Sequence, residues 1–252
     1  MDEAMRAVLD PSNWTDEWEL HTYLRLDGMY FRSAQASLEK ARASRAGIKK
    51  ARAAYRIQLA RLEAIQTKYD GDVERAYDEL EPVAISMEDF EYRVGLAYAP
   101  YLEGLALTHI LSAAALEAHI NIWAAARLSK RALKKFDRQP LAAKWLDLPA
   151  LLSLRGFSAR RKPFVHFIAL LRYRNALVHY RDRAEIWTSP GVPGFLRDLG
   201  LTVAAAQRSL RTVREMVEAL SAQLKEETPF WLLRAIPFNY LEIDVPVLRR
   251  KR

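Results

Sequence analysis

Apolar residues recur at intervals of three and four positions along most of the chain, which is the spacing of one face of an α-helix. No segment shows the strict alternation that is typical of a half-buried strand. Between Asn13 and Glu81, where proline is absent, a narrow apolar stripe runs among charged residues: Tyr55, Leu59, Leu62, Ile65 and Tyr69. So narrow a stripe is typical of a helical hairpin or coiled-coil arm. We expect Gly47 to separate its two helices and Gly71 to lie at its far end.

Wider apolar faces follow in the middle of the chain. Ser86, with Asp89 three residues later, resembles a capping box, so a new helix is expected to begin there. The most apolar helix comes after Pro100, and Pro163 is placed to open another. A last strong helix is expected from about Leu201 to Glu227.

These patterns predict an all-α protein in three parts. Residues 1–85 form a long helical hairpin arm, residues 86–227 form an antiparallel helical bundle, and residues 228–252 form a tail with no predicted structure.

Composition narrows the class of protein. The chain has 252 residues, enough for a sizeable core, and 39 Lys and Arg against 31 Asp and Glu give it a net charge of +8, which suits an anionic partner such as RNA. It has no cysteine, and its first residues lack an apolar signal segment, so we expect a cytoplasmic protein. The apolar run from Leu105 to Ala126 contains Glu117, His119 and Asn121, so no membrane association is expected.

The helix after Pro163 carries polar residues where core residues are expected. Its apolar stripe consists of Phe164, Ile168 and Leu171, and its next members are Asn175 and Val178. Asn175 thus falls on the expected core face, with His179 one turn later and Arg174 beside it. Such groups cost free energy when buried unless they are hydrogen-bonded or face a cavity or partner. Two interpretations fit this pattern. In the first, Asn175 and His179 form a buried amide–imidazole pair and Arg174 lies in solvent; in the second, the three residues form a functional site.

A second polar cluster lies in the most apolar helix. Glu117 is the only acidic residue in its segment, and Asn121 follows it one turn later. An unpaired buried carboxylate is strongly unfavourable, and Arg174 is the natural partner because its guanidinium can hold a carboxylate through two hydrogen bonds. An ordinary interhelical salt bridge would equally bring the two clusters together.

An acidic residue in one apolar helix, followed in a later helix by Arg174, Asn175 and His179, resembles the HEPN superfamily. The signature of that superfamily is an arginine, four to six residues, and a histidine, with a polar residue directly after the arginine. Arg174 fits with four intervening residues; Arg172 fits with six, but Tyr173 does not match the polar position. The resemblance covers roughly residues 86–227.

The resemblance implies a fold, an activity and a set of roles. Many HEPN proteins are metal-independent endoribonucleases that act as toxins or in phage defence, and two copies of the motif form one cleft in a homodimer. By this resemblance Arg174 and His179 are the catalytic residues, Asn175, Glu117 and Asn121 support them, and no cofactor or metal is needed. The implied partners are RNA, a second copy, and an antitoxin or regulatory protein. Some members have lost activity and only bind nucleotides or proteins.

The side chains suit RNA cleavage by the ribose 2′-hydroxyl. An imidazole can take up and release a proton near neutral pH, and arginine offers a fork of donors to phosphate oxygens. Basic residues around the motif are expected to bind RNA; they are Arg172, Arg181 and Arg183, with a longer basic run at 127–138. His109 and His166 fall on apolar stripes and are interpreted as core residues.

Two functions therefore remain open at the level of sequence. The first is an endoribonuclease that cleaves single-stranded or loop RNA. The second is a non-catalytic helical module whose arm and polar face hold a partner protein or nucleic acid. An open Arg174–His179 surface favours the enzyme, whereas a sealed one favours the module.

Overall fold

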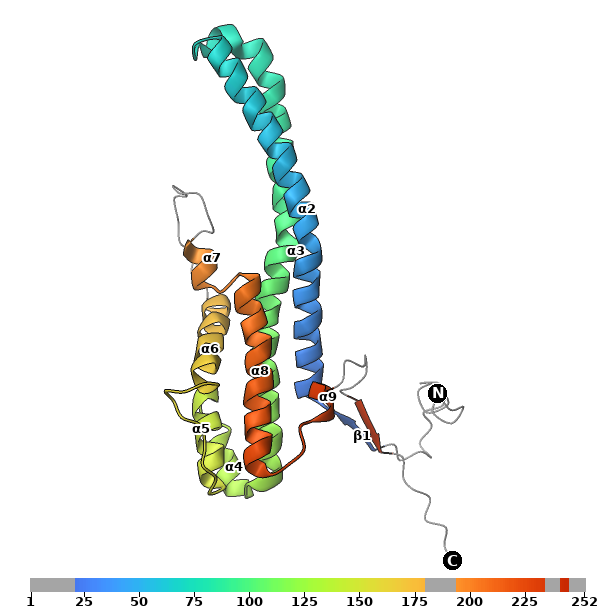
Figure 1. Cartoon of the computed structure of the whole chain (residues 1–252), viewed down its shortest axis with the longest axis vertical. Helices are drawn as coiled ribbons and strands as arrows, with labels where there is room; N and C mark the ends of the chain where they lie inside the picture. The colour runs from blue at the N-terminus through green and yellow to red at the C-terminus, as the bar shows by residue number, and fades with distance from the viewer. Residues whose placement is uncertain (1–20, 180–193, 234–240, 245–252) are drawn as a thin grey trace, which may run out of the picture.

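The computed structural model describes residues 21–179, 194–233 and 241–244. Most of these residues are helical, which confirms the all-α class. Two short strands, β1 (His21–Leu24) and β2 (Leu241–Asp244), pair antiparallel with His21 opposite Asp244. This pairing brings the two ends of the described chain together beside the bundle (Figure 1).

Two very long helices form a hairpin that runs through the bundle and projects beyond it (Figure 1). They are α2 (Leu26–Lys68) and α3 (Val73–Arg127). The turn between them is made at Gly71, whose φ of 76° is a conformation that glycine adopts at little cost. The side chain of Asp72 then caps α3 by accepting a hydrogen bond from the Arg75 amide at 3.2 Å. A long helical hairpin arm was predicted correctly, but its turn was expected at Gly47 and lies at Gly71, which was expected only at the far end of the arm.

The internal boundaries of the arm differ from the prediction. Helix α2 continues through Gly47, which lies in open space where a glycine costs only helix propensity. Helix α3 continues through both Ser86 and Pro100, so neither residue begins a helix. The divide predicted at residue 86 is therefore not a break in structure. One helix belongs to the arm in its first half and to the bundle in its second.

The bundle is built around the second half of α3 and the first part of α2. It is completed by α5 (Leu141–Leu151), α6 (Phe164–Val178) and α8 (Val203–Leu224). Short helices α4 (Lys130–Phe136), α7 (Gly194–Asp198) and α9 (Phe230–Leu233) connect or cover these elements. Helix α8 ends at Leu224, three residues before the predicted limit of 227, and its C-cap residue Lys225 has a φ of 58°.

Three apolar clusters divide the interior. The largest fills the bundle and includes the fully buried rings of Phe136, Trp145 and Trp231. A second joins α2, α3 and α8 at the base of the arm through Leu38, Leu105 and Ala206, among others. A third lies near the tip of the arm around Ile65, Ala76 and Val83. Thus the arm has a core of its own, thinner than that of the bundle.

One stretch of α3 is long and apolar enough to cross a membrane by length and composition. Half of that stretch is buried against the rest of the protein.

Candidate functional site

The Arg174, Asn175 and His179 side chains belong to the C-terminal end of α6. The Arg174 Nη1 donates a hydrogen bond to the Asn175 Oδ1 at 3.0 Å. His179 is the C-cap residue, and its backbone amide donates to the Asn175 carbonyl oxygen at 2.9 Å. Arg174 is half-buried, whereas Asn175 and His179 are exposed. The motif is therefore an open surface rather than a sealed pair.

The prediction that Asn175 lies on the core face is wrong. The face of α6 that packs into the bundle runs through Phe164, Phe167 and Leu170, which are at most 2% exposed. It continues toward the half-buried Arg174 and Leu177. The predicted stripe through Ile168 and Leu171 lies at the edge of this face and turns outward before Asn175. The amide is consequently available to solvent and to a ligand.

The predicted ion pair between Glu117 and Arg174 is absent: among the described residues, Glu117 forms no ion pair, and its side chain is exposed. The physical reason is the register of the antiparallel helices α3 and α6. Tyr173 lies beside His109 of α3, with ring centroids 5.0 Å apart. Glu117 is eight residues further along α3, or about 12 Å at 1.5 Å per residue.

Asn121 does not reach the motif either. Its Oδ1 accepts a hydrogen bond from the Nζ of Lys144 on α5 at 3.0 Å. Lys144 is itself only 4% exposed, so this contact satisfies an ammonium group inside the bundle. The supporting role predicted for Asn121 is therefore replaced by a structural one.

A compact cluster fixes the end of α6 in place. His109 is fully buried, with its Nδ1 2.8 Å from the Ser209 Oγ and its Nε2 2.8 Å from the Gly200 carbonyl oxygen. Gly200 has a φ of 70°, and a Cβ at that position would lie 2.7 Å from the ring of Tyr173. The interpretation of His109 as a satisfied core residue is confirmed. The cluster positions Tyr173, and hence the neighbouring Arg174.

The other basic residues of the predicted site have mixed outcomes. Arg172 is exposed on α6, so it is free to contact an anionic ligand. Arg181 and Arg183 lie outside the described residues. His166 is not part of that site: it was interpreted as a core residue, but it is only partly buried, and its Nδ1 lies 3.6 Å from the Glu215 Oε2, too far for a hydrogen bond.

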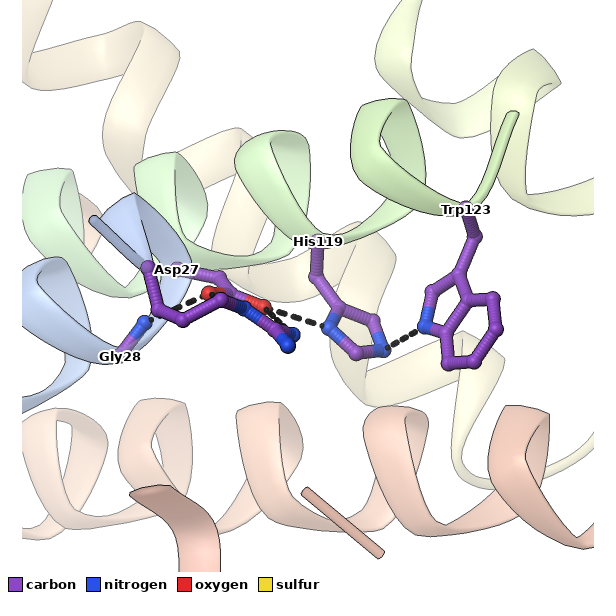
Figure 2. Close-up of polar contacts among 5 residues, drawn as sticks. Asp27, Gly28, His119 and Trp123 are labelled. Carbon is purple, nitrogen blue, oxygen red and sulfur yellow. Dashed lines mark hydrogen bonds and ion pairs between the residues drawn. The ribbon is translucent and has the colours of Figure 1, made fainter. Parts of the chain in front are cut away.

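A chain of buried polar contacts that was not predicted from sequence joins the start of α2 to α3 (Figure 2). The His119 Nδ1 lies 2.8 Å from the Asp27 Oδ2, and the Trp123 indole Nε1 donates to the His119 Nε2 at 3.0 Å. Because the indole can only donate, the His119 Nε2 must be unprotonated and the proton must sit on Nδ1. Asp27 also accepts from Arg25 and from the Gly28 amide. The side chains of Asp27 and His119 are fully buried.

Burial and hydrogen bonding act in opposite directions on this pair. Burial lowers the pKa of His119, and the hydrogen bond and charge of Asp27 only partly oppose it. Burial also raises the pKa of the Asp27 carboxyl, but hydrogen bonds from His119 and Arg25 outweigh this and hold it below its usual value. The ring of Trp145 stacks on His119 at 6.2 Å between centroids. With every polar atom engaged, this chain ties α2 to α3 and is not a free proton donor.

Among the described residues, no group of three or more His, Cys, Asp or Glu side chains is placed to hold a metal ion. A pocket of about 580 Å³ lies between α4 and α5, lined in part by Arg131, Lys135 and Asp147. Neither Arg174 nor His179 lines it.

The surface at the end of α6 offers three functional groups: the guanidinium of Arg174, the amide of Asn175 and the imidazole of His179.

No protein family model matches the chain, and neither a curated protein nor a solved structure matches it.

Proposed function

We propose that the protein is a metal-independent endoribonuclease that cleaves single-stranded or loop RNA at the end of α6. The observation that carries the proposal is the exposed grouping of Asn175 and His179 beside the Arg174 guanidinium. The resemblance of this segment to the HEPN superfamily supports the same activity. A toxin or phage-defence role in the cytoplasm, with an antitoxin or other regulatory protein as partner, belongs to this proposal.

The reaction we propose is attack of the ribose 2′-hydroxyl on the adjacent phosphate. A base removes the 2′-hydroxyl proton, the new P–O bond forms, and the bond to the 5′-oxygen breaks as that oxygen gains a proton. The products are a 2′,3′-cyclic phosphate and a 5′-hydroxyl. His179 is the residue in the motif that can exchange these protons.

Arg174 would stabilise the negative charge that develops on the phosphate oxygens. Its partner is Asn175, which takes the positioning role first expected of Glu117. The side-chain oxygen of Asn175, Oδ1, accepts from Arg174. The N–H groups of the same side-chain amide therefore remain available to donate to a phosphate oxygen.

One protomer supplies one histidine at this site, whereas the reaction needs both a base and an acid. A two-fold dimer that brings two α6 ends together would supply both, and two-fold pairing is the commonest symmetry of homo-oligomers. The homodimer is thus part of the proposed mechanism.

A non-catalytic helical module is the second candidate, and the projecting arm favours it. Helices α2 and α3 extend well beyond the bundle (Figure 1), and such an extension serves a partner more directly than it serves a reaction centre. In this second function, the α6 surface binds a protein or a nucleic acid and does not cleave it.

Incubation of the purified protein with a mixed pool of RNA in EDTA distinguishes the two. We expect cleavage by the unaltered protein and a loss of about 10²–10⁴-fold in His179→Ala, the usual contribution of general acid–base catalysis. His166→Ala is the matched control, because His166 lies on the same helix outside the motif. Absence of cleavage by the unaltered protein would favour the module.

A further inference from the structure

One face of α2 changes from apolar to basic where the helix leaves the bundle. Phe31, Leu38, Arg45 and Arg52 follow one another at intervals of seven residues and so lie on nearly the same face of α2. Phe31 and Leu38 are 3% and 2% exposed, whereas Arg45 and Arg52 are exposed. The face that packs against the bundle is therefore continued by arginines as soon as the covering helices end.

These arginines belong to a longer stripe with alternating steps of three and four residues. We call it the α2 basic stripe, and its members are Arg42, Arg45, Lys49, Arg52 and Arg56. It runs from residue 42 to residue 56, which is fourteen steps along the helix, or about 21 Å. Arg42 forms an ion pair with Glu39, whereas the other four form none with a described residue. Four cations are thus held in a row without a neutralising carboxylate.

The α2 basic stripe begins close to the end of α6. Leu38 and Ala41, which precede the stripe directly, belong to the cluster at the base of the arm. Leu177, two residues before His179, packs against the same cluster. Helix α6 accordingly ends at the end of the bundle from which the arm projects (Figure 1). A chain bound along the stripe would therefore lead toward the motif.

We propose that the α2 basic stripe binds the phosphodiester backbone of single-stranded RNA and guides it to the Arg174–His179 surface. This inference rests on the proposed function, which supplies RNA as the ligand. A row of five cations about 21 Å long, four of which form no ion pair with a described residue, can follow several consecutive phosphates. Contacts to phosphates carry no base preference, so DNA of the same sequence and length should bind this stripe as well.

A second copy of the chain is the competing occupant. The outer face of α3 carries an exposed row of mixed acidic and apolar residues: Glu74, Asp78, Glu81, Ile85, Glu88 and Tyr92. Helix pairing depends on apolar side chains from both helices. The α2 basic stripe contains only arginine and lysine, which favours a nucleic-acid backbone over a helix.

The test uses the full chain with His179→Ala, so that bound RNA stays intact. Arg45→Gln, Lys49→Gln, Arg52→Gln and Arg56→Gln are combined, since glutamine preserves length and helix propensity. The control is the combination Lys130→Gln, Arg131→Gln, Lys134→Gln and Lys135→Gln on α4, which removes the same charge from exposed positions. These residues belong to the basic run that was expected around the motif, but α4 lies at the end of the bundle away from the arm and from the end of α6 (Figure 1). Fluorescence anisotropy with a labelled single-stranded RNA of mixed sequence gives the Kd at several salt concentrations, and circular dichroism verifies the helix content.

We expect the α2 variant to raise the Kd for RNA by on the order of tenfold or more. The slope of log K against log salt concentration should become less steep by about 3, because each of the four lost phosphate contacts contributes about 0.7. The α4 control should retain most of the affinity. In a chain with His179 intact, the α2 variant should raise KM more than it lowers kcat, as expected for lost uniform binding.

Unchanged affinity and salt dependence in the α2 variant, or an equal loss in the α4 control, would overturn the inference. So would failure of the parent protein to bind RNA at low salt. Loss of self-association with unchanged RNA binding would assign the stripe to a second copy instead. These outcomes do not depend on cleavage, so they are distinguishable from failure of the proposed function.

Discussion

The ring of Tyr173 lies beside that of His109, with 5.0 Å between their centroids, and this contact sets the register of α6 against α3. It fixes the level at which Arg174 and His179 leave the bundle. It also separates them from Glu117, which is two turns further along α3. The candidate site is thus held by an aromatic contact and a glycine rather than by the ion pair expected from sequence.

Stability should fall on mild acidification. Burial lowers the pKa of both His109 and His119, against the opposing hydrogen bonds to Gly200 and Asp27. Below about pH 6.5 an unfolded chain protonates these histidines while the native protein keeps them neutral, so the unfolded state binds more protons. The free energy of unfolding should then decrease by up to about 1.4 kcal/mol per pH unit for each histidine.

Urea unfolding followed by circular dichroism across this range measures the effect. Asp27 adds to the loss only at more acidic pH, because its pKa lies below the usual carboxyl value. A free energy of unfolding that stays constant or rises from neutral pH down to about pH 5.5 would contradict the two buried neutral histidines.

Trp123→Phe should destabilise the protein and also weaken its pH dependence. The substitution removes the N–H that donates to the His119 Nε2 at 3.0 Å and leaves a buried acceptor unsatisfied, at a cost of about 1–3 kcal/mol. The freed nitrogen can then accept a proton more readily, so the loss of stability below neutral pH should be shallower than in the parent. An unaltered pH slope would show that the indole does not hold His119 neutral.

Gly200→Ala should cost more than Gly156→Ala. Both glycines have positive φ, 70° and 76°, so alanine is strained at either position. Only at Gly200 does the new Cβ meet a ring, 2.7 Å from Tyr173, whereas at Gly156 the nearest atom is 3.8 Å away. We expect an additional loss of about 1–3 kcal/mol at Gly200 from overpacking, together with reduced RNA cleavage. Equal losses in thermal unfolding would indicate that Tyr173 moves aside freely.

Glu117→Gln should change little. Its side chain is exposed and does not pair with Arg174, so stability should stay within about 0.5 kcal/mol and cleavage should be retained. Asn175→Ala, by contrast, removes the group that holds the Arg174 guanidinium and should lower the rate. The comparison is made with initial rates on one RNA substrate; a large effect of Glu117→Gln alone would restore its predicted role.

The pattern of the sequence predicts the helices well because each apolar stripe is local. The arm stripe that ends at Tyr69 needed no knowledge of tertiary packing, whereas the turn between the two arm helices was expected at Gly47 and lies at Gly71. Helix boundaries were less predictable, since Gly47 and Ser86 are compatible with a helix interior that long-range packing against the facing helix stabilises.

Side-chain partners depend on register, which local patterns do not encode. The Asp27–His119 contact joins residues 92 positions apart, and no spacing signal links them. The available clue was His119 itself, a polar side chain within the apolar run from Leu105 to Ala126. Asn175 was placed on the core face because two stripes, through Ile168 and through Phe167, are nearly equivalent in hydrophobicity at the start of α6.

The chemistry of the product ends tests the central claim most directly. A short RNA should be incubated in EDTA with the parent protein and with Arg174→Lys, which keeps the charge but loses the forked donors. Mass spectrometry should show 5′ fragments ending in a 2′,3′-cyclic phosphate for the parent, most of that product lost in Arg174→Lys, and none from an RNA with a 2′-deoxyribose at the cleavage site. Fragments with 5′-phosphate ends, cleavage that requires a metal ion, or cleavage of the 2′-deoxy substrate would contradict 2′-hydroxyl attack at Arg174 and His179.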